Sequence, residues 1–102
     1  MFNYFNSNND GAHMQENNLS QENFATLQKA RKDLVGEIQA IIEYDDHIKT
    51  SSNKTANATW ESIRNEELVH VGELLSLINY LAPYQKQFID KGAEEFGEIV
   101  SK

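Results

Sequence analysis

The sequence contains no cysteine, which excludes disulfide bonds, thiolate zinc sites, rubredoxin-type iron sites and cysteine nucleophiles. Any metal must therefore be bound through oxygen and nitrogen atoms. Basic residues are also scarce, since 9 lysines and arginines stand against 16 acids and give a formal net charge of -7. This charge argues against nucleic acid as a partner, because binding a phosphate backbone needs clustered lysine and arginine.

Long apolar runs are absent from the sequence as well. No stretch approaches the roughly 20 apolar residues that span a bilayer, and the N-terminus lacks the pattern of a secretory signal. We therefore expect a cytoplasmic protein with no membrane association. The 102 residues correspond to one small domain that buries only a modest share of its surface, so we expect association with further copies.

The first 19 residues, MFNYFNSNNDGAHMQENNL, are rich in asparagine and show no helical or strand periodicity. This composition predicts a disordered tail. The opening MFNYF gathers three aromatic residues, so a short docking peptide is the alternative to a purely mobile tail. The triplet Ala12-His13-Met14 is typical of a vector-derived linker. On that interpretation part of the tail is not native, and His13 has no function.

Residues 20–102 predict an all-α domain built around two long helices. Ser20 is a candidate N-cap for a helix that ends near Thr50, and the segment SSNK at 51–54 predicts the turn that follows. The second helix is expected from about Thr55 to Leu81. The two helices are long enough to form an antiparallel hairpin.

A single proline, Pro83, ends the second helix, because proline lacks an amide hydrogen and disfavours a helical conformation in the residue before it. A shorter and weaker third helix is expected over about 84–98. Gly92 and Gly97 lower its expected regularity, since glycine is a poor helix former. There is no strand signal and no internal repeat.

Each long helix carries an apolar stripe at alternating spacings of three and four residues, as expected for faces that pack together. The stripe of the first helix comprises Leu27, Ala30, Leu34, Glu37, Ile41, Tyr44 and Ile48. That of the second comprises Trp60, Ile63, Glu67, His70, Leu74, Leu77 and Leu81. Three ionisable residues therefore interrupt two otherwise apolar seams.

In an antiparallel hairpin, residues equally distant from the turn lie opposite each other. Glu37 and Glu67 both lie 15 positions from residue 52, about 22 Å along their helices at 1.5 Å per residue, so they should face each other. Burying two carboxylates is costly unless positive charge compensates them. No lysine or arginine occupies either seam, which leaves a proton or a metal cation. His70, one turn from Glu67, favours a metal. The alternative is a structural pair in which Glu67 and His70 hydrogen-bond each other.

A four-helix bundle with a carboxylate-bridged dimetal site takes one glutamate from each of two helices and a Glu-x-x-His motif from each of the other two. This chain contains one copy of each element, Glu37 and Glu67-x-x-His70. Two chains related by a two-fold axis would therefore complete both the bundle and the ligand set. We expect a homodimer with the site on its axis.

Glu37, Tyr44 and the Glu67-x-x-His70 motif, with 30 residues between the two acids, make residues 20–98 similar to the encapsulated ferritin family, in which each chain is half of a ferritin-like bundle. The resemblance implies that Glu37 and His70 of each chain bind an iron ion. It also implies that Glu67 of both chains bridges the pair and that Tyr44 lies beside the ligands. Dimers of this family assemble into an annular decamer, and its iron(III) product is mineralised inside an encapsulin shell that holds the ferroxidase as cargo.

Two features differ from that family. Family members carry further acids and a tryptophan beside the ligand of the first helix, where this chain has Gly36, Gln39 and Glu43. The C-terminal EFGEIVSK also lacks a capsid-targeting tail of the expected type. Encapsulation would then use MFNYF or sequence outside this chain, or would not occur.

The predicted activity is oxidation of Fe(II) to Fe(III) by dioxygen or peroxide at a di-iron site shared between two chains, for iron storage or detoxification. Manganese or zinc fits the same ligands. A rubrerythrin-like peroxide reductase is an alternative, although the missing cysteines would leave it dependent on an external electron donor. A non-catalytic helical scaffold is a second alternative and would need no metal.

Overall fold

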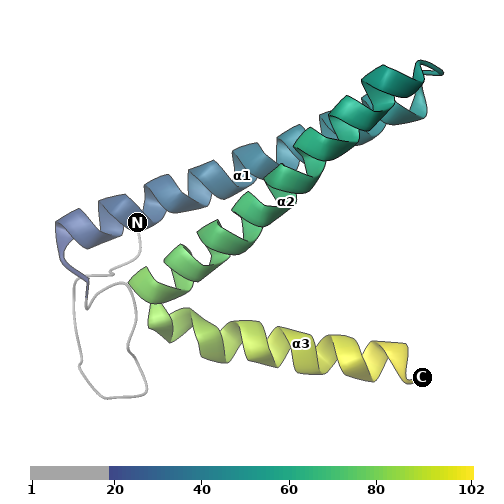
Figure 1. The fold of residues 1–102 in the computed structure, drawn as a ribbon. Coiled ribbons are helices and arrows are strands. Elements are labelled where there is room, and N and C mark those ends of the chain that lie inside the picture. Colours follow the sequence, from purple (N-terminus) through teal and green to yellow (C-terminus); the bar gives the residue numbers. More distant parts are fainter. Residues whose placement is uncertain (1–18) are drawn as a thin grey trace. The chain divides into compact units, whose positions relative to one another are not determined.

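The computed structural model describes residues 19–102, and every regular element in that range is helical. The helices are α1 (Gln21–Lys49), α2 (Lys54–Leu81), the short 3-10 helix η3 (Pro83–Gln85) and α3 (Lys86–Val100). Figure 1 shows them in chain order. The all-α prediction is confirmed for this part of the chain. The predicted tail, with MFNYF and His13, lies outside the described residues apart from Leu19.

The predicted helix boundaries are accurate to within two residues for both helices of the hairpin. Ser20 caps α1 as expected, because its Oγ accepts a hydrogen bond of 3.0 Å from the amide of Asn23. Helix α2 begins one residue earlier than predicted, since Asn53 is its cap and its side-chain oxygen accepts a 2.9 Å hydrogen bond from the amide of Ala56. Both caps satisfy amides that have no partner inside the helix.

Pro83 stops α2 as predicted, although the chain does not pass directly into α3. Ala82 adopts φ -135° and ψ 67°, outside the helical region, and Pro83 then opens the single 3-10 turn η3. Helix α3 starts at Lys86, two residues later than expected, and continues through Gly92 and Gly97 to Val100. The two glycines therefore do not interrupt the helix.

The chain divides into two compact units. One is Gln28–Leu77, and the other joins the described residues up to Leu27 with Ile78–Lys102. In Gln28–Leu77 the helices α1 and α2 run in opposite directions beside each other (Figure 1), and Arg64 Nη1 donates a 2.8 Å hydrogen bond to Asp45 Oδ1 across them. In the other unit Leu27, Ile78 and Ala82 are buried.

The seam predicted on α1 is confirmed, because each of its seven residues is buried or half-buried. The seam on α2 is confirmed from Trp60 to Leu74 and at Leu81, which is half-buried, but it is wrong at Leu77, which is 40% exposed, whereas Ile78 is buried. An α-helix has 3.6 residues per turn, so a strict alternation of three and four drifts around the helix over several turns. The buried face therefore moves on by one residue.

Candidate metal centre

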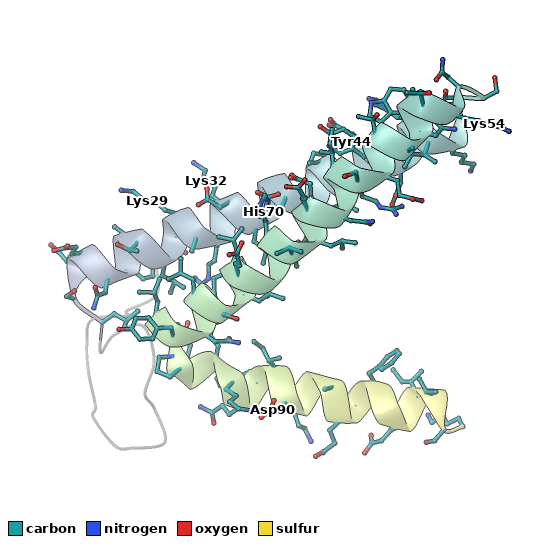
Figure 2. The ribbon with its side chains drawn as sticks, viewed as in Figure 1. Lys29, Lys32, Tyr44, Lys54, His70 and Asp90 are labelled. Atoms are coloured by element: carbon teal, nitrogen blue, oxygen red, sulfur yellow. The ribbon has the colours of Figure 1, made fainter. Side chains whose placement is uncertain are left out.

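Glu37 of α1 and Glu67 and His70 of α2 form a half-buried group between the two helices of the Gln28–Leu77 unit. Each offers one ligand atom, and the three atoms all lie within 4.8 Å of one another. The predicted pairing of Glu37 with Glu67 across the hairpin is thereby confirmed. His70 lies on the part of α2 that runs beside α1 (Figure 2).

The two distances from His70 to the carboxylates are long for hydrogen bonds and suitable for a shared ion. His70 Nδ1 lies 3.4 Å from Glu67 Oε1 and 3.5 Å from Glu37 Oε2. Hydrogen bonds between nitrogen and oxygen cluster near about 2.9 Å. Two donors that each lie about 2.1 Å from one metal ion, at a tetrahedral angle, are about 3.4 Å apart. The two distances from His70 are therefore close to the separation of two ligands on one ion.

The electrostatics of the group leave negative charge without full compensation. Glu37 Oε2 is buried and has no hydrogen-bond partner. A hydrogen bond with Glu37 raises the pKa of the Glu67 carboxyl, and partial burial and the negative charge of Glu37 raise it further, while His70 opposes the rise. The only ion-pair partner of either carboxylate within residues 19–102 is His70. A divalent cation would supply the missing positive charge.

An open cavity of about 570 Å³ connects the group to solvent. Its lining residues are the three ligand candidates together with Lys32, Asp33, Gly36, Glu73 and Leu74. The side chain of His70 is 44% exposed, while those of Glu37 and Glu67 are 23% and 19% exposed. Water, a second metal ligand or a small oxidant can therefore reach the group from this side.

Tyr44, which the family resemblance places beside the ligands, lies two turns nearer the hairpin turn on the same seam of α1 and is half-buried. It does not line the cavity. Its ring makes an edge-to-face contact with His47 at 6.0 Å between centroids, and His47 contacts Trp60 in the same way at 4.9 Å. The structure therefore places Tyr44 in an aromatic cluster.

The other acidic residues near the motif have different surroundings. Glu43 lies four residues before His47, the spacing of an ion pair on a helix, but it accepts a 3.3 Å hydrogen bond from Gln39 Nε2. Glu73 of α2 is exposed and lines the cavity. Asp33 of α1 lines it as well. Asp33 belongs to no motif that the sequence analysis identified. Its spacing of four residues before Glu37 is the signal that would have placed it beside the site.

No family model, curated protein or solved structure matches this chain. The site therefore has to be interpreted from its own geometry and donor chemistry. None of the helices in the described part of the chain is both long and apolar enough to cross a membrane.

Proposed function

We propose that this protein is a ferroxidase that oxidises Fe(II) to Fe(III) at a di-iron site shared between two chains. The observation that carries the proposal is the convergence of Glu37, Glu67 and His70 within 4.8 Å in a hairpin seam. Two carboxylates and one imidazole form a donor set suited to iron, manganese or zinc, and oxygen ligands favour the higher oxidation state of iron.

The incomplete ligand set supports a site made by two chains. Three ligand atoms from one chain are fewer than an iron ion usually binds, while two copies offer two imidazoles and four carboxylates, the set of a dimetal four-helix bundle. The hairpin also exposes apolar side chains beside its seam, with Val35 at 68%, Ile42 at 56% and Leu68 at 51%. A second hairpin packed against the first would bury such side chains and form a ferritin-like bundle.

The chain's residues then have distinct roles. Glu37 and His70 of each chain would hold one iron ion, and Glu67 of both chains would bridge the two ions. The two Fe(II) ions are substrates, and each gives one electron to dioxygen or peroxide. The protein positions the ions and leaves coordination sites open toward the cavity of about 570 Å³. No side chain needs to act as a general base in this step.

The biological setting we propose is iron storage or detoxification in the cytoplasm, with the protein as cargo of an encapsulin shell. The resemblance of Glu37, Tyr44 and Glu67-x-x-His70 to the encapsulated ferritins supports it, and the same resemblance implies an annular decamer built from dimers. An assembly of this kind would hold several di-iron sites close to the compartment in which iron(III) accumulates.

The deciding experiment is an anaerobic Fe(II) titration followed by exposure to air, with Fe(III) detected by absorbance. We expect a fast phase that saturates at about one iron per chain, two per dimer. Glu37→Ala and His70→Ala should lose this phase and keep their helical circular dichroism. A wild-type protein without a saturable fast phase would refute the ferroxidase. Retained oxidation in both variants would refute the site.

A further inference from the structure

Helix α3 presents a continuous apolar face that no other described residue covers. Five large side chains on it are more than half exposed, namely Phe88, Ile89, Phe96, Ile99 and Val100. Their spacing places all five within about 120° of arc at 100° per residue. An exposed apolar face of this kind marks an interaction surface.

Gly92 lies in the middle of this face, between Ile89 and Phe96, and Ala93 lies at its edge. Glycine inside a helix costs about 1 kcal/mol relative to alanine. Nothing lies within 4 Å of a Cβ built on Gly92, so packing inside the chain does not require the missing side chain. Gly36, Gly72 and Gly97 have equally open surroundings, so what distinguishes Gly92 is its place at the centre of an exposed apolar face, where a missing side chain leaves room for the close approach of another helix.

We propose that α3 pairs antiparallel with α3 of a second copy of this chain across a two-fold axis near Gly92 and Ala93. A pairing of this kind is self-complementary, because each contact occurs twice. Residues equally distant from the axis lie opposite each other, so Ile89 of one copy packs beside Phe96 of the other. Gly92 at the centre of the face lets the two helices approach closely enough for these larger side chains to interlock.

The charges of α3 favour the antiparallel direction. Its lysines, Lys86 and Lys91, lie in the first half of the helix, whereas Glu94, Glu95 and Glu98 lie in the second half. Within one chain these groups form only exposed local pairs, such as Lys86 with Asp90 (labelled in Figure 2) at 2.7 Å. Of the three glutamates, only Glu95 borders the apolar face, and antiparallel pairing brings it near Lys91 of the other copy. A parallel arrangement would instead place Glu95 near its own copy, which is repulsive.

The helix is less suited to a membrane surface. Amphipathic helices that bind anionic lipids carry lysine and arginine on their polar face, whereas α3 carries two lysines and four acids. The apolar area also fits a second copy. If each of the five exposed side chains contributes roughly 100 Å², the pair buries about 1,000 Å² in total, near the lower limit of specific interfaces. The association is therefore expected to depend on protein concentration.

The test compares Gly92→Glu with Gly97→Glu, two identical substitutions in one helix. Nothing lies within 4 Å of a Cβ at either position, so neither change disturbs packing within the chain. Gly92→Glu places two carboxylates face to face on the proposed axis, whereas Gly97 lies on the charged side of α3. Sedimentation velocity with EDTA, over a range of protein concentrations, is expected to show about a tenfold or greater weakening of self-association for Gly92→Glu and wild-type association for Gly97→Glu. Equal behaviour of both variants, or a wild-type monomer throughout, overturns the pairing.

A second measurement identifies the element that α3 contacts. Because the chain has no cysteine, single cysteines can be introduced at Ala93, near the axis, and at Glu94, on the opposite side of the helix. A short bis-maleimide should cross-link Ala93→Cys into a covalent dimer and leave Glu94→Cys monomeric on a denaturing gel. Association without this cross-link would mean that α3 contacts another partner or element, and would overturn the proposal. Neither measurement depends on metal binding or on ferroxidase activity.

Discussion

The imidazole of His70 on α2 lies 3.5 Å from the carboxylate of Glu37 on α1 and 3.4 Å from that of Glu67 on its own helix. One neutral or singly charged imidazole cannot balance two carboxylates that approach each other in a half-buried seam. The strained part of this arrangement is the carboxylate pair, since Glu37 has a buried oxygen without a partner and raises the pKa of Glu67. The group is therefore better suited to hold a cation than to stabilise the hairpin.

Divalent metal should stabilise the folded protein. At a free metal concentration 100 times the dissociation constant, binding to the folded state alone adds about 2.7 kcal/mol. We expect Zn²⁺ or Co²⁺ to raise the melting temperature of the wild type in differential scanning calorimetry. His70→Ala should lose most of the shift, because it removes the imidazole ligand. His47→Ala, which removes an imidazole of the same hairpin outside the site, is the control and should keep the shift. Equal shifts in both variants would contradict the ligand assignment.

The hairpin and its site were largely predictable because they depend on local periodicity. Turn position and helical rise alone place Glu37 opposite Glu67, and the structure confirms this pairing. The detailed seam was less predictable, because the drift of a 3.6-residue helix replaces Leu77 with Ile78 only after several turns.

Side-chain choices among several neighbours were not predictable from spacing. Glu43 and His47 have the spacing of an ion pair, yet Glu43 accepts a hydrogen bond from Gln39, and His47 contacts Tyr44 and Trp60. These preferences depend on ring packing across the hairpin, for which a single helix carries no signal. The exact start of α2 was also not predictable from spacing. Serine and asparagine are both suitable N-cap residues, and only the structure shows that Asn53 caps the helix rather than a neighbouring serine.

The cap at Asn53 should contribute measurably to stability. Replacing an N-cap asparagine with alanine leaves a helix amide unpaired and costs about 1 kcal/mol. We expect Asn53→Ala to lower the free energy of unfolding in urea by about that amount. Ser52→Ala is the matched control in the same turn, because the Ser52 side chain forms no hydrogen bond with the described residues. A loss no larger than that of the control would show that the amide of Ala56 finds another acceptor.

Glu67 should make the metal-free protein less stable as the pH rises. Its folded-state pKa lies above the ordinary value of 4.5, so the folded state binds more protons than the unfolded state in the interval between the two values. Stability from this group is fully present below pH 4.5 and is lost as the pH rises through the folded pKa. Glu67→Gln should remove this part of the pH dependence in urea unfolding with EDTA. The control is Glu66→Gln, on the exposed side of α2, which should retain the wild-type pH dependence. Identical profiles for the wild type and Glu67→Gln would contradict the raised pKa.

Replacing the site with apolar side chains should separate stability from function. Glu67→Leu combined with His70→Leu removes both the repulsion between carboxylates and the desolvation of polar groups, and such replacements of buried charged groups are often neutral or stabilising by about 1–4 kcal/mol. Because the His70 side chain is 44% exposed, we expect only a small rise in the free energy of unfolding in urea with EDTA. The same variant should lose fast Fe(II) oxidation.

Glu66→Leu, on the exposed side of α2, is the control and should gain no stability and keep its activity. If the protein is instead a scaffold without a metal centre, the double variant should gain the same stability, but the wild type should show no fast Fe(II) oxidation. A double variant that is both destabilised and inactive would show that Glu67 and His70 are necessary for folding, and the interpretation of their charges as part of a metal site would then lose its thermodynamic support.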